Sequence, residues 1–148
     1  MSPASRRRVL MAVQAETPWE QMAFPLSGFS VSSAYTKQQL SGDSIRVFNS
    51  QSQTYRNSVA NFTTSEGYEY KYECDIATAS GTGKVVCRNA SGTTVSGTGS
   101  EAVTTSAHVS VVFPHKPGIA KLALFCTWTT AEIGDVTFTG LKLYRRPV

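Results

Sequence analysis

The chain has 148 residues, enough for one domain of ordinary size with a single core. Its hydrophobic residues, 41% of the total, form no run near the ~18 apolar residues of a membrane-spanning helix, which argues against a helical membrane protein. Ser, Thr and Gly number 18, 17 and 11, against three Asp and two His, so residues that move protons or bind metals are scarce. We therefore expect no catalytic activity, no metal and no cofactor.

The formal charge of +4 is concentrated at the two ends of the chain. Three arginines lie at positions 6–8 and two at 145–146, whereas residues 9–144 hold nine Lys or Arg against ten Asp or Glu. A surface that follows a nucleic-acid backbone needs basic residues spread over one face, with aromatic residues between them. The nearly neutral body therefore predicts that nucleic acid is not a partner.

Residues 1–24 are predicted to form a basic N-terminal arm, extended or with a short helical turn. The apolar stretch at 9–13 has five residues where the core of a signal peptide needs roughly 7 to 15, so no signal peptide is expected. Because polar chain ends are mobile unless something holds them, we expect this arm to dock on a neighbouring chain. The alternative is that the arm folds back on its own domain. The expected docking residues are Arg6, Arg7, Arg8, Val9, Leu10 and Trp19.

The helical turn is expected at residues 17–20 (TPWE), which match a helix-capping pattern with Pro at the first helical position. Pro25 and Gly28 follow closely and prevent a long helix. The main domain is therefore expected to span residues 25–148.

From there the hydrophobic pattern has a period of two, as in strands packed on one face. The alternation is clearest at 68–76, where tyrosines, Cys74 and Ile76 share one face and charged residues share the other. Further strands are expected at 45–49, 108–113, 122–128 and 136–144. Residues 78–106, rich in Ser, Thr and Gly, are expected to contain two weak edge strands.

Two residues in the last two expected strands allow specific structural predictions. Gly140 separates two stretches of opposite parity and predicts a bulge or kink. Trp128 continues the apolar face of residues 122–126, which favours packing in the core. Turn residues separate all these runs and no long helical pattern occurs, so the sequence predicts an all-β protein, an antiparallel β-sandwich or jelly roll of about eight strands.

The three cysteines, Cys74, Cys87 and Cys126, cannot all pair within one chain, and none has the spacing of a zinc site. We expect buried thiols in a reducing compartment. Neither His108 nor His115 has an acid or nucleophile next to it in sequence, and no known catalytic motif occurs. This supports the expectation of a non-catalytic protein.

One polar run has the chemistry of a sugar-binding surface, in which an aromatic ring stacks on a pyranose while planar polar groups bind the hydroxyls. The alternative interpretation is a solvated hairpin, because amides are common in surface turns. The candidate ligand-binding residues are Asn49, Gln51, Gln53, Tyr55, Arg56 and Asn57.

Three stretches have a distinctive pattern: residues 42–47 (GDSIRV), 67–70 (GYEY) and 135–144 (DVTFTGLKLY). Through them, residues from about 26 to 146 resemble the β-sandwiches of carbohydrate-binding modules related to the xylan- and cellulose-binding families. The sequence departs from the family in lacking the usual acidic calcium cluster, and no residue matches a family sugar contact.

Similar modules occur on the tails and head surfaces of bacteriophages, where an N-terminal arm docks on the particle. The resemblance thus implies a non-catalytic structural or binding protein of a phage virion, a capsid decoration or tail component made in the host cytoplasm. Its partners would be other virion proteins, in an oligomer or larger assembly. The alternative is a glycan-binding adhesion module for host-surface polysaccharide.

Overall fold

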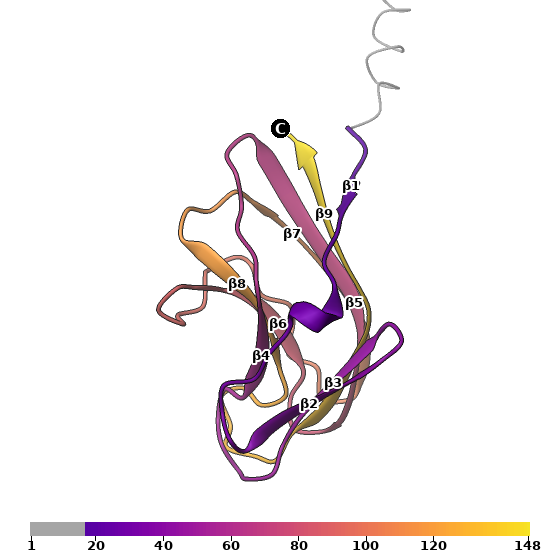
Figure 1. Cartoon of the computed structure of the whole chain (residues 1–148), viewed down its shortest axis with the longest axis vertical. Helices are drawn as coiled ribbons and strands as arrows, with labels where there is room; N and C mark the ends of the chain where they lie inside the picture. The colour runs from indigo at the N-terminus through magenta and orange to yellow at the C-terminus, as the bar shows by residue number, and fades with distance from the viewer. Residues whose placement is uncertain (1–16) are drawn as a thin grey trace, which may run out of the picture.

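A computed structural model describes residues 17–148 as a sandwich of two antiparallel β-sheets (Figure 1). The expected all-β sandwich is confirmed, with nine strands in the described residues where about eight were expected. The expected docking residues Arg6, Arg7, Arg8, Val9 and Leu10 lie outside the described part of the chain.

The large sheet has six strands in the order β2-β3-β9-β5-β7, and β1 pairs with β9 beyond the end of β3. Alternation at residues 68–76 is confirmed, because Tyr70, Tyr72, Cys74 and Ile76 are buried between the sheets. The strands are β1 (Glu20–Met22), β2 (Thr36–Ser41), β3 (Ser44–Asn49), β5 (Tyr68–Ser80), β7 (Ser106–Pro114) and β9 (Asp135–Pro147).

The predicted irregularity at Gly140 is confirmed as a bulge in β9. Glu73 pairs with Lys142 whereas Asp75 pairs with Thr139, so β9 carries one extra residue opposite β5. Gly140 lies within this extra stretch with a φ of 66°. The bulge changes the parity of β9, which allows residues on both sides of it to face the same core.

The small sheet has the order β4 (Asn57–Asn61), β8 (Ile119–Phe125) and β6 (Lys84–Asn89). Within residues 78–106, β6 is the one strand that lies wholly inside the range, so the expected pair of edge strands is wrong. The hydroxyls of Thr98 and Ser100 accept hydrogen bonds from the backbone N–H groups of Cys87 and Val85, at 3.1 and 3.0 Å. These side chains satisfy donors that a second strand would otherwise have satisfied.

The helical turn expected at residues 17–20 is wrong, because Glu20 already belongs to strand β1. Pairing with the edge of β9 satisfies backbone groups that a single helical turn would leave without partners. The Trp19 ring is held nearby, with the Arg146 guanidinium 4.2 Å and the Lys71 ammonium 4.9 Å from its centre. The described end of the expected arm therefore packs on its own domain, and the first strand begins before residue 25.

The core lies between the two sheets and contains all three cysteines as free, buried thiols. Burial raises the pKa of Cys74, Cys87 and Cys126 to about 12. The helical element of residues 17–148 is the single 3-10 turn η1 (Leu26–Gly28), and no helix in this part is long and apolar enough to cross a membrane.

Candidate functional site

The polar run at residues 49–57 connects the two sheets, because β3 belongs to the large sheet and β4 to the small one. Its backbone is fastened to the segment after β8. The N–H of Tyr55 donates to the carbonyl of Trp128 at 2.9 Å, and the N–H of Arg56 donates to the Thr127 hydroxyl at 2.9 Å. The run is therefore an ordered connection between the sheets and does not form a hairpin of adjacent strands.

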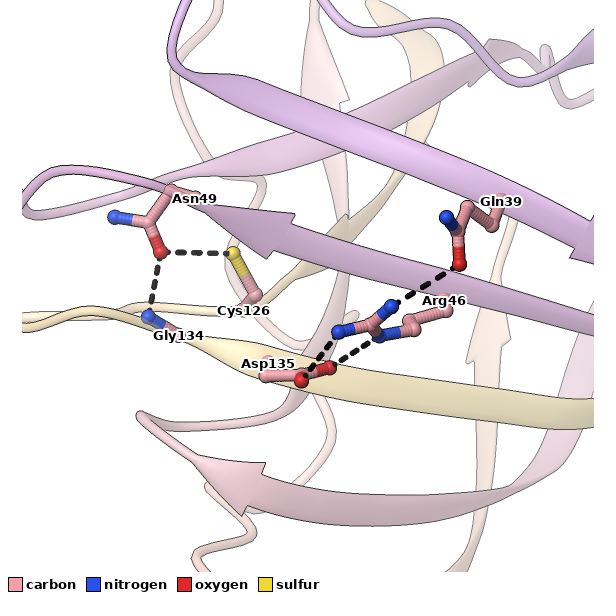
Figure 2. Close-up of polar contacts among 6 residues, drawn as sticks. All are labelled: Gln39, Arg46, Asn49, Cys126, Gly134 and Asp135. Atoms are coloured by element: carbon pink, nitrogen blue, oxygen red, sulfur yellow. Dashed lines mark hydrogen bonds and ion pairs between the residues drawn. The ribbon is translucent and has the colours of Figure 1, made fainter.

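Asn49 lies in the interior, where it fastens this connection (Figure 2). Its Oδ1 accepts hydrogen bonds from the backbone N–H of Gly134 at 2.5 Å and from the Cys126 thiol at 3.7 Å. Its Nδ2 donates to the carbonyls of Gln51 and Glu132. With its amide used inside the protein, Asn49 has a structural role and is left out of the candidate site.

A second group in Figure 2 ties β3 to β9 on the outer face of the large sheet. The Arg46 guanidinium makes two hydrogen bonds of 2.8 Å to the Asp135 carboxylate and one of 3.0 Å to Gln39 Oε1. The bond from Arg46 holds the pKa of Asp135 below its usual value. This group is structural too, since all its charges are matched within the sheet.

The outer face of the small sheet is unusual because it is also apolar. Leu122 and Leu124 of β8 face the main core, whereas Phe125 and Ala123 face outward and form a second cluster with Val86. Val59 and Trp128 pack against this cluster from its margin. We call this surface, made by the outward side chains of β4, β6 and β8 together with Tyr55 and Trp128, the small-sheet face.

Trp128 therefore lies on the small-sheet face, and the expectation that it packs in the main core is wrong. The strand β8 ends at Phe125, so the alternation that predicts an inward side chain does not extend to residue 128. Its ring contacts Phe125 edge-on, with ring centres 4.8 Å apart, and contacts Tyr55 in the same way at 5.1 Å. Three aromatic rings thus form one continuous patch.

Tyr55 presents its ring from a strained backbone. It has a φ of 55° and is the only non-glycine residue with a positive φ among residues 17–148. This conformation costs an L residue about 1 kcal/mol or more, and such strain is concentrated at functional sites. The residue is 50% exposed. This backbone conformation places a large aromatic ring at the surface, beside Trp128.

Two hollows lie side by side on this face. The first has a volume of about 280 Å³, and the second, of about 240 Å³, shares Arg88 and Gly92 with it. The first is lined by Tyr55, Arg88, Gly92, Thr94, Phe125 and Trp128. The second is lined by Ser32, Asn57, Val59, Arg88, Ala90, Ser91, Gly92 and Lys121. Of the six candidate residues, Tyr55 and Asn57 line these hollows and the other four do not.

Arg88 lies between the hollows in a fixed position. Its Nε donates to the Gly92 carbonyl at 2.8 Å, its Nη1 donates to Asn57 Oδ1 at 3.1 Å, and its guanidinium lies 5.9 Å from the centre of the Phe125 ring. Partial burial lowers the pKa of Arg88 from its usual value, although an arginine stays charged at neutral pH. The side chain offers a cation and N–H donors to both hollows.

Sequence reasoning missed Arg88, Phe125 and Trp128 as members of a site. One signal was available, because residues 122–126 (LALFC) are apolar without interruption. Such a run belongs to a strand that is covered on both faces. In a two-layer sandwich, only one face of β8 is covered by the other sheet, so the run points to an apolar outer face.

None of the residues that line either hollow is a His, Cys, Asp or Glu. His108 Nδ1 lies 2.8 Å from Asp75 Oδ1 on the large sheet, where both side chains are exposed. Within residues 17–148, no group of three or more His, Cys, Asp or Glu side chains is placed to hold a metal ion.

Comparisons with known proteins bear on the fold. No family model and no curated protein sequence matches the chain. Among solved structures, a mutant of a family 29 carbohydrate-binding module matches with a TM-score of 0.59 and 9% identity, covering 88% of this chain and 92% of that one. A family 4 module matches with a TM-score of 0.58 and 8% identity, covering 80% and 79%.

A third match is a chain of the Clostridium thermocellum endo-1,4-β-D-xylanase 10B that contains a family 22 carbohydrate-binding module and a GH10 module. It has a TM-score of 0.55 and 15% identity, and covers 88% of this chain and 28% of that one. The chain therefore has the β-sandwich fold of carbohydrate-binding modules, as the resemblance implied.

Proposed function

We propose that the chain is a non-catalytic glycan-binding module that holds a sugar chain on the small-sheet face. The observation that carries the proposal is the pair of partly exposed rings, Tyr55 and Trp128, at the edge of a hollow that Arg88 borders with its N–H donors. An aromatic ring beside planar polar groups is the usual combination for binding a pyranose.

The size of the hollows fits this role. Each is smaller than the roughly 300 to 1,000 Å³ of pockets for drug-sized ligands, and together they fall within that range. Because they share Arg88 and Gly92, they are suited to neighbouring units of one oligosaccharide. The Thr94 hydroxyl borders the first hollow and can bond to a sugar hydroxyl. The Asn57 amide borders the second hollow, where it bonds to the Arg88 guanidinium at 3.1 Å and to the Tyr55 carbonyl at 3.0 Å and so orients both residues.

The fold gives independent support. Family 29 modules of the same fold have been solved with cellulohexaose and with mannohexaose. The comparisons favour the glycan-binding interpretation over a virion role. Localisation in a bacteriophage particle, with docking through Arg6, Arg7, Arg8, Val9 and Leu10, stays a prediction from the sequence.

The proposal is tested by removing each ring and measuring binding on a glycan array and by calorimetry. We expect Trp128→Ala and Tyr55→Gly to weaken binding by about fivefold or more, taking about 1 to 3 kcal/mol for each stacked ring, the value found for bases stacked on aromatic side chains. Tyr55→Gly also removes the backbone strain, so the free energy of unfolding should change by less than about 1 kcal/mol.

Tyr35→Ala is the matched control, because Tyr35 is similarly exposed at 43% and lines neither hollow. It should bind like the unmodified protein. If no glycan binds, or if Tyr35→Ala weakens binding as much as Trp128→Ala, the proposed site is wrong.

A further inference from the structure

The strands of the small sheet carry positive charge only. They contain Lys84, Arg88 and Lys121 and no Asp or Glu. The pairing register places Arg88 directly opposite Lys121 and Lys84 opposite the outward-facing Phe125. All three cations therefore lie on the small-sheet face, while every carboxylate within a described strand belongs to the large sheet.

None of these cations has a carboxylate partner within residues 17–148, where the ion pairs join other side chains. Lys84 Nζ donates to the Ser100 carbonyl at 2.7 Å and lies 4.9 Å from the centre of the Trp128 ring. Lys121 Nζ lies 3.5 Å from Asn61 Oδ1. Neutral acceptors orient these cations and leave their charge uncompensated.

Building on the proposed function, we infer that the bound glycan is anionic and that Arg88 and Lys121 bind its carboxylate, sulfate or phosphate groups. Arg88 lines both hollows and Lys121 lines the second, and no acidic side chain lines either. A negative group there would meet two cations and no negatively charged side chain.

The geometry of Arg88 suits an oxyanion. A guanidinium has five N–H donors, and the bonds to Gly92 and Asn57 use two of them. The remaining donors are held in a fixed plane, which favours the two oxygens of a carboxylate, sulfate or phosphate. Because the side chain is already ordered, little conformational entropy is lost when the anion binds.

Single-stranded nucleic acid is also anionic and stacks on aromatic rings, but the rings here are poorly arranged for it. Successive bases need faces on which to stack, whereas Tyr55 and Trp128 meet edge-on with their planes at 76°. We therefore favour an acidic glycan.

The test is a calorimetric comparison of hexasaccharides with the full chain. The neutral set is cellohexaose, mannohexaose and xylohexaose; the acidic set is hexagalacturonate and a heparin-derived hexasaccharide; the nucleic-acid probe is a thymidine hexanucleotide. We expect one acidic sugar to bind at least tenfold more tightly than every neutral one, with an affinity that falls as NaCl rises. The two acidic sugars separate a uronate ligand from a sulfated one.

Charge-removing variants test which side chains bind the acidic sugar. Lys121→Gln and Arg88→Gln should each weaken acidic-sugar binding about tenfold, as expected for a lost charge-assisted hydrogen bond. Lys142→Gln removes the same charge from the exposed side of the large sheet and should change nothing. Replacing Arg6, Arg7 and Arg8 with Gln should also leave binding intact. Lys121 is a surface side chain, so its variant keeps the test valid if Arg88→Gln misfolds.

Each other outcome is decisive. If neutral sugars bind as tightly as acidic ones and Trp128→Ala abolishes this binding, the glycan-binding proposal stands and the charge inference is wrong. If no sugar binds, both are wrong. Tightest binding of the hexanucleotide would instead identify a nucleic-acid surface, and equal losses in Lys142→Gln and Lys121→Gln would indicate nonspecific attraction.

Discussion

Gly134 lies so close to Cys126 that no side chain fits at position 134. A Cβ added at this position would come 2.1 Å from the Cys126 carbonyl oxygen. The backbone N–H of Gly134 donates a hydrogen bond to Asn49 Oδ1 (Figure 2). Relieving that clash would move the backbone away and leave buried polar groups without partners. We expect Gly134→Ala to lower the free energy of unfolding by about 3 kcal/mol, measured by urea denaturation.

Gly28→Ala provides the control at this scale, because no atom lies within 4 Å of the added Cβ and its backbone is not left-handed. It should stay within about 0.5 kcal/mol of the unmodified protein. Equal stability of the two variants would show that the connection between β8 and β9 has room to move.

At the scale of the element, the bulge in β9 depends on the conformation of Gly140. Its φ of 66° is costly for an L residue, whereas the space around it is open, with Asp43 Oδ2 4.0 Å from an added Cβ. The cost of a side chain is therefore conformational. We expect Gly140→Ala to lose about 1 kcal/mol of unfolding free energy, and Gly140→Asn to lose less, because Asn tolerates this region.

The order of the two Gly140 variants is the informative result in equilibrium denaturation. If Gly140→Asn is as unstable as Gly140→Ala, the left-handed backbone is not what the glycine provides. The bulge in β9 could be predicted from the sequence, because the apolar residues before and after Gly140 alternate with opposite parity.

For the whole molecule, the N-terminal segment separates into two parts with different expected roles. Residues 1–15 lie outside the described chain, whereas β1 pairs with β9 and Met22 packs against the core. Deleting 1–15 should change the unfolding free energy by less than about 0.5 kcal/mol. Deleting 1–22 should cost about 3 kcal/mol through lost strand pairing and apolar burial.

The shorter deletion also tests the predicted virion role. If the arm docks on a phage particle, the protein lacking residues 1–15 should stay folded and lose particle association in a co-sedimentation assay. Full occupancy of particles by the truncated protein would contradict docking through the arm.

The sequence by itself determined the fold class, the inward tyrosines of β5 and the bulge at Gly140. These features are local, because an alternating side chain reports directly which face of a strand is buried. It also determined the polar chemistry of residues 49–57, of which Tyr55 and Asn57 line the candidate site. It could not place Asn49 inside the protein, since an amide in a polar run looks the same whether buried or exposed.

Only the tertiary structure decided which residues meet on the small-sheet face. Tyr55, Arg88 and Trp128 come from three separate segments, and the pairing of β4, β6 and β8 brings them together. The net charge of residues 9–144 is close to zero and gives no sign that the strands of the small sheet carry only positive charge. The carboxylates that balance these cations lie on the large sheet, and the two groups are separated only when the sheets form. Strand pairing is set by contacts between distant residues, and no local pattern encodes it.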